Sequence, residues 1–161
     1  MRQLNFKIIG ESMPAVEIEL ECQQTVIAEV GAMTYFEDEI SLEVKISDGA
    51  VKDEGAFSKL FSAAKRIISD ESLFITHFTN DSLYSNKHVS FSAPFPGQII
   101  PILFNEIGTV FCQKNAFLCG TLGTRLSVAF STKLGAGFFG GEGFILQKIE
   151  GGSDDLAFIH G

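Results

Sequence analysis

Apolar and polar residues alternate along much of the chain, which is the pattern of β-strands with one buried face. In segment 16–21 three aliphatic residues alternate with three glutamates, and segment 40–46 alternates in the same way. Successive side chains of a strand point to opposite faces, so each segment predicts one face in the core and one in water. We predict further strands at 6–9, 26–29, 32–36, 73–79, 89–93, 98–103, 110–113, 117–119, 126–131, 144–149 and 156–159. Many short strands broken by Gly, Pro, Asn and Asp predict an all-β sandwich or barrel.

Segment 55–69 has a different spacing, with apolar residues every three or four positions. This spacing predicts one short amphipathic helix whose apolar stripe covers an open end of the β structure. The other side of the helix carries Lys59, Lys65 and Arg66. This basic flank offers an alternative role, contact with an anionic membrane or an acidic partner. Three cations attract a membrane by only about 1 kcal/mol each, so we expect any membrane contact to be weak.

The two halves of the chain resemble each other. Thr25–Ala28 matches Thr109–Cys112, and in the same register Leu42 falls on Leu126. Self-similarity at a fixed offset is typical of repeat architectures. We therefore predict two copies of one β unit packed side by side.

The units are predicted at residues 1–93 and 94–161. A second matching block returns after a shorter connection, so the helical segment of the first unit corresponds to the glycine-rich segment 134–141 of the second. That segment contains Phe138 and Phe139. Together with the basic flank of the helix, these two residues form our candidate partner surface: Lys59, Lys65, Arg66, Phe138 and Phe139.

Charge and cysteine content narrow the range of partners and cell compartments that we expect for this chain. The 161 residues include 12 Lys and Arg against 20 Asp and Glu, a net charge of −8. Nucleic-acid binding depends on cationic side chains that neutralise phosphates, so we do not expect a nucleic-acid partner. The three cysteines are few and odd in number, and no secretory or mitochondrial leader pattern opens the sequence. These features predict reduced thiols in a soluble cytoplasmic protein.

The most specific-looking motif is the glycine pattern Gly135-x-Gly137-x-x-Gly140. A dinucleotide site needs such a loop to open a helix, whose N-terminal amides hold the pyrophosphate. Here residues 144–149 have a strand pattern instead. We therefore interpret the glycines as a compact connection between strands and predict no cofactor.

Metal and catalytic signatures are also missing. His77, His88 and His160 stand alone, without the close pairing that places two imidazoles on one metal. No Gly-x-Ser-x-Gly motif occurs, and Cys112 and Cys119 lie in apolar or turn segments typical of buried cysteines. A protease-like pair of Cys and His stays open, because such partners meet only in the fold. We predict no catalytic or metal-binding residue and no enzymatic activity.

Several separate motifs, in order along the chain, resemble one protein family. They are Phe6–Gly10, Val26–Met33, Glu71–Phe74, Ala93–Gly97 and Gly140–Phe144. The family is a largely uncharacterised one, common in bacteria and named after a yeast protein of altered mitochondrial inheritance. The resemblance covers essentially the whole chain.

The resemblance implies a fold like that of the tryptophan RNA-binding attenuation protein, built from double-stranded β-helix-like units. Family members carry three such units in a pseudo-threefold arrangement, and this sequence ends at Gly161, about where a third unit would begin. It also reads Glu21–Gln24 where the family usually has a Pro-Gly turn. The family provides no catalytic residues to transfer, and its eukaryotic relatives are linked to mitochondrial membrane organisation, which implies a scaffold or binding role.

We therefore expect a non-enzymatic, cytoplasmic scaffold or protein-interaction module. Either the sequence is a fragment that lacks the third unit, or assembly between chains supplies that unit. Two units of three would leave strand edges and apolar surface unpaired, and such edges invite pairing. The expected partner is a further copy of the chain or another protein. The alternative function is binding of a small ligand or RNA in the crevice between the β repeats.

Overall fold

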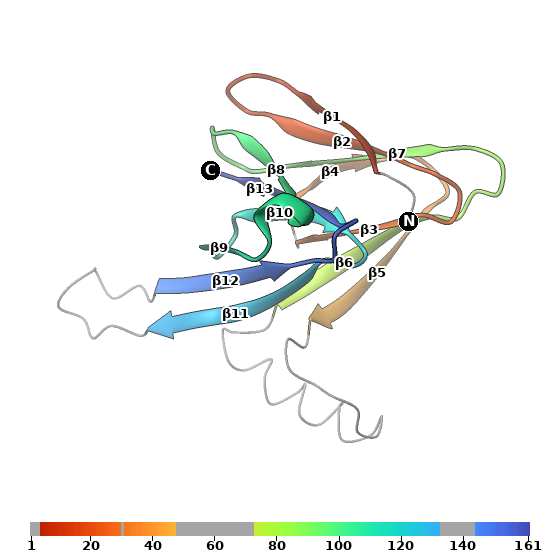
Figure 1. Ribbon diagram of the computed structural model, residues 1–161. Coiled ribbons are helices and arrows are strands. Elements are labelled where there is room, and N and C mark those ends of the chain that lie inside the picture. The colour runs from red at the N-terminus through yellow and green to blue at the C-terminus, as the bar shows by residue number, and fades with distance from the viewer. Residues whose placement is uncertain (1–3, 30, 48–72, 133–143) are drawn as a thin grey trace, which may run out of the picture.

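The computed structural model describes residues 4–29, 31–47, 73–132 and 144–161, and in these ranges the chain forms three antiparallel sheets (Figure 1). The all-β prediction is therefore confirmed. Sheet A has the order β1 (Asn5–Ile9), β2 (Ala15–Leu20), β7 (Lys87–Ser92), β4 (Met33–Phe36). Sheet B has the order β5 (Ile40–Ser47), β6 (Leu73–Asn80), β3 (Thr25–Glu29), β10 (Phe117–Thr121), β13 (Leu156–His160), β8 (Ile99–Leu103). Sheet C has the order β11 (Arg125–Thr132), β12 (Phe144–Glu150), β9 (Val110–Gln113).

Sheet B is the middle layer and contributes side chains to two separate cores. On one face its residues pack with those of sheet A, in a cluster that includes Val26, Phe158 and Phe91. On the other face they pack with sheet C, in a cluster that includes Ile27 and Leu126. A strand buried on both faces has apolar residues at successive positions, which is why Val26, Ile27 and Ala28 are all buried.

The alternating segments that opened the sequence behave differently in the structure. In β2, Val16, Ile18 and Leu20 are fully buried, as the alternation predicts. In β5 the strand is confirmed and Ile40 is buried as predicted, but the predicted burial of Leu42 and Val44 is wrong, because they are 45% and 63% exposed. β5 is the outer strand of sheet B, and the core between sheets A and B includes Ile40 but neither Leu42 nor Val44.

The structure also contains a short helix that the sequence pattern did not predict. Residues Phe104–Ile107 form a single turn, α2, directly after β8, and its Phe104 is buried in the core between sheets B and C. The predicted helix at 55–69 and the glycine-rich segment 134–141 lie outside the described residues.

The same strand pairings occur twice. The order β5-β6-β3 matches the order β11-β12-β9, and β2-β7-β4 matches β8-β13-β10. Registers correspond as well, since Ile27 pairs with His77 as Phe111 pairs with Lys148. Even an irregularity recurs at the same place, between Met33 and Tyr35 in β4 and between Phe117 and Cys119 in β10. Strands β2–β7 and strands β8–β13 thus form two sets with one pairing scheme.

Candidate functional site: two open strand edges

The partner surface expected from the sequence lies outside the structure's described part. This holds for all five candidate residues, which are Lys59, Lys65, Arg66, Phe138 and Phe139. The structure brings none of them into a site, and a candidate site has to be built from the residues that it describes.

One strand pairing joins the two sets of strands into a single sheet. Strand β3 of the first set pairs with β10 of the second, with Ala28 opposite Cys119 and Ile27 opposite Gly120. The side chains of Ala28, Cys119 and Ile27 are buried there. Backbone hydrogen bonds and side-chain packing therefore both hold this junction together.

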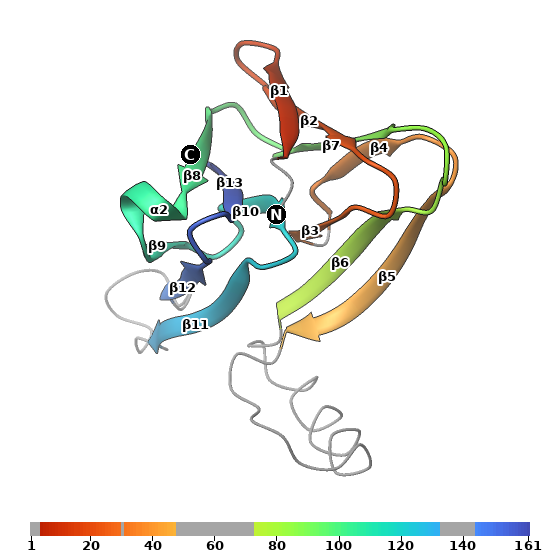
Figure 2. The same cartoon turned by 45° about the vertical axis from the view of Figure 1, so that its right-hand side comes forward.

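The counterparts of these two strands have no such neighbour among the residues that the structure describes. By the recurring scheme, β10 corresponds to β4 and β3 corresponds to β9. Among the described strands, β4 is an outer strand of sheet A and β9 an outer strand of sheet C. The two strands lie on opposite sides of the molecule in Figure 2. Within the described ranges the chain thus has one open edge of each kind that its internal junction uses.

Large apolar side chains are exposed on both open edges. Tyr35 and Phe36 of β4 are each 41% exposed, and Phe111 of β9 is 58% exposed. Outer strands of soluble proteins are usually protected by charged residues, proline or a covering segment. β9 (Val-Phe-Cys-Gln) and β4 (Met-Thr-Tyr-Phe) have neither charge nor proline within them. Exposed aromatic residues on unpaired backbone are typical of an interaction surface.

Two of the histidines, His77 and His88, do not share a face with Cys119. His77 lies on the face of sheet B opposite to Cys119, since its cross-strand partner is Ile27 whereas that of Cys119 is Ala28. His88 lies on the outer side of sheet A, where its Nδ1 is 3.2 Å from the Glu37 carboxylate.

The thiols themselves are poor nucleophiles. Burial, together with the nearby Glu29 carboxylate, raises the pKa of Cys112 to about 11. Burial alone raises the pKa of Cys119 well above its ordinary value. The thiolate is the reactive form, so the raised pKa leaves little of Cys112 reactive at neutral pH.

Metal sites and membrane spans are not found in the described part of the chain. No group of three or more His, Cys, Asp or Glu residues there is arranged to hold a metal ion. No helix in the same ranges is long and apolar enough to cross a bilayer.

Comparison with known proteins gives the family. Residues 6–161 match the family model described as mitochondrial biogenesis AIM24. The chain belongs to this family. The crystal structure of protein SPYM3_0169 from Streptococcus pyogenes is similar to this AIM24-family chain, with a TM-score of 0.68 at 22% sequence identity. The similarity covers 98% of this chain and 64% of the Streptococcus protein, so the chain spans under two thirds of that protein's length. No curated protein matches the chain.

Sequence reasoning pointed to open edges but not to these two strands. Segments 33–36 and 110–113 are ordinary short strand patterns, and nothing in either shows which strands they pair with. The available signal was the internal match of Thr25–Ala28 with Thr109–Cys112, which marks β3 and β9 as counterparts.

Proposed function

We propose that this AIM24-family chain is a non-enzymatic, cytoplasmic interaction module that associates with further copies of its own β unit. The two sets of strands, β2–β7 and β8–β13, are two copies of that unit. The observation that carries the proposal is the β3–β10 junction, whose counterparts β4 and β9 are both open. The strand β4 of one molecule pairs with β9 of the next, as β10 pairs with β3 inside the chain.

The internal junction predicts the register of this contact. Cys119 opposite Ala28 corresponds to Tyr35 opposite Cys112 of the neighbour, and Gly120 opposite Ile27 corresponds to Phe36 opposite Phe111. The second correspondence places two exposed aromatic residues against each other. Cross-strand aromatic pairs stabilise a sheet by roughly 0.2–1 kcal/mol relative to Ala pairs, in addition to the apolar area they bury.

Because the contact joins two different edges, the number of chains in the assembly is not limited to two. Each chain that joins the assembly uses one edge and brings another, so growth continues past the dimer unless the ring closes. The strands are short, and we expect weak, concentration-dependent association. This supports a scaffold role in which each chain links two others. The description of the family as one of mitochondrial biogenesis is compatible with that role and adds no activity.

A pair of complementary variants tests the proposal by sedimentation velocity at micromolar concentrations. Phe36→Arg places a charge on β4 and leaves β9 intact, whereas Phe111→Arg does the reverse. Both side chains are substantially exposed, so neither change should unfold the chain. Each variant alone should sediment as a monomer of 17.5 kDa. A mixture of the two should form a capped one-to-one dimer, because each supplies the edge that the other lacks.

Val44→Arg is the matched control, because it places the same charge on an exposed position of another outer strand, β5. It should associate as the unchanged chain does. A monomeric unchanged chain would overturn the proposal. So would a mixture that stays monomeric, or a Val44→Arg variant that behaves like the other two.

A further inference from the structure

A cavity of about 280 Å³ lies beside the β3–β10 junction, and no part of the proposed edge pairing uses it. Its lining comes from the end of β3, the segment that follows β7, and the turn that leads into β10. Binding pockets for drug-sized molecules measure about 300–1,000 Å³, and this cavity lies just below that range, so it suits a ligand of only a few heavy atoms. A single ring or a short chain fits that size.

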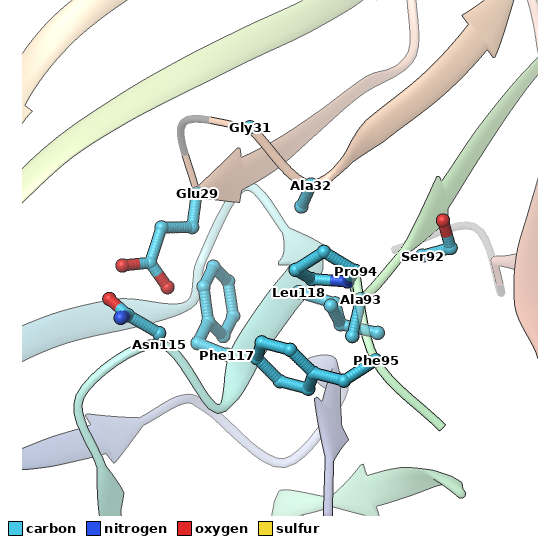
Figure 3. Close-up of a pocket in the computed structure, with 10 residues that line it drawn as sticks. All are labelled: Glu29, Gly31, Ala32, Ser92, Ala93, Pro94, Phe95, Asn115, Phe117 and Leu118. Atoms are coloured by element: carbon cyan, nitrogen blue, oxygen red, sulfur yellow. The ribbon is translucent and has the colours of Figure 1, made fainter. Parts of the chain in front are cut away.

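The cavity has one polar end. Figure 3 shows the Glu29 carboxylate and the Asn115 side chain pointing toward one another there. Among the described residues that line the cavity, Glu29 is the only one with an ionisable side chain. Asn115 lies in a tight turn with φ of 73°, a left-handed conformation that Asn tolerates better than most residues. The turn fixes where the amide points.

The Glu29 carboxylate is half-buried, and burial disfavours its charged form. Desolvation raises its pKa, and the opposing effects of the Lys114 charge and of a hydrogen bond from the Gln147 side chain do not cancel that rise. A further cation beside the carboxylate would stabilise its charged form.

The rest of the lining is apolar. Phe117 and Leu118 are buried residues of β10, and Phe95 and Pro94 lie beyond them along the cavity (Figure 3). An apolar body can therefore pack against aromatic rings while a polar head reaches Glu29. The Phe95 ring also packs at 5.7 Å from the His160 ring, which supports it from the other side.

We propose that this cavity binds a small primary amine with an apolar body. The ammonium group donates hydrogen bonds to the Glu29 carboxylate and to the side-chain carbonyl of Asn115. The body packs against Phe95 and Phe117. A cation fits better than an anion because the one charged lining residue is acidic and the whole chain carries a net charge of −8. A neutral ligand of the same shape would add no opposite charge beside the half-buried carboxylate.

The test compares benzylamine with benzyl alcohol by isothermal titration calorimetry on the full chain. The two probes have nearly the same shape and differ in the charge of the head group. Benzylamine should bind about tenfold more tightly, the ratio expected for one charge-assisted hydrogen bond. Glu29→Gln keeps the shape of the side chain and removes its charge, so it should lower the affinity for benzylamine to that for benzyl alcohol.

Glu150→Gln is the control, since it removes one carboxylate from a strand that does not line the cavity. It should leave the binding of both probes unchanged, and circular dichroism should show all variants folded. Equal affinities for amine and alcohol would overturn the proposal. Unchanged amine affinity in Glu29→Gln, or no measurable binding of either probe, would overturn it as well.

Discussion

Replacement of Asn80 by Ala should destabilise the fold more than any exposed polar substitution. The Asn80 side chain is fully buried at the end of β6 and makes three hydrogen bonds of 2.9 Å. Its Nδ2 donates to the backbone carbonyls of Leu20 and Ser85, and its Oδ1 accepts from the backbone N–H of Ser82. One amide thus ties β2 and β6 to the loop that follows.

The size of the stability loss follows from the backbone groups that the substitution leaves without a hydrogen-bond partner. Leu20 and Ser82 are buried, so Asn80→Ala leaves one carbonyl and one N–H there unsatisfied, at about 1–3 kcal/mol each. The Ser85 carbonyl belongs to an exposed residue, and water can replace its partner. We expect a loss of about 3 kcal/mol in the free energy of unfolding. This is the summed cost of the two unsatisfied groups after the surrounding structure has partly adjusted. For a chain of this size that lowers the Tm by about 9 °C.

Urea unfolding followed by far-ultraviolet circular dichroism measures this loss, because the chain has no Trp. Asn86→Ala is the matched control, since Asn86 is exposed and donates one hydrogen bond of 2.9 Å to Glu19. It should change stability by less than about 0.5 kcal/mol. If the two variants are equally stable, the reasoning about buried hydrogen bonds is wrong.

Three further outcomes are expected. Gly123→Ala should cost about 2 kcal/mol in urea unfolding, because a methyl group there would overlap the Asp155 carboxylate. Burial raises the pKa of Glu29, so its charge lowers stability above that pKa and has no effect below the ordinary value of 4.5. Glu29→Gln should therefore raise the Tm at pH 7 and leave it unchanged at more acidic pH. Cys112 should react with iodoacetamide far more slowly than free cysteine at neutral pH, and faster as the pH approaches 11.

Much of the secondary structure could be predicted from the sequence, because the alternation of apolar and polar residues shows which side chains share one face of a strand. Segment 16–20 has one buried face and one face toward solvent, and β2 forms there as predicted. The same pattern misleads for Leu42 and Val44, because period-2 alternation shows which residues share a face and does not show that anything covers it. Whether an outer strand is covered depends on how far the neighbouring sheet extends.

The candidate sites depend on contacts between distant segments. Glu29, Asn115 and Phe95 line one cavity only because β3 and β10 pair although more than half of the chain's length separates them. No local pattern specifies that pairing. The internal sequence match came nearest, since it relates β3 to β9, but the open edges became visible only when the strand orders were known.

Cross-linking of opposed cysteines tests the pairing of β4 with β9 most directly. Phe36→Cys and Phe111→Cys are introduced together into a chain that also carries Cys22→Ser, and the Cys22→Ser chain alone is the control for Cys112 and Cys119. Residues opposite each other in adjacent strands have Cβ atoms about 4.5–5.5 Å apart, within reach of a short bismaleimide. The proposed register predicts a ladder of covalent dimers, trimers and larger species on a denaturing gel. A single monomer band, or a band pattern identical to that of the control, would contradict it.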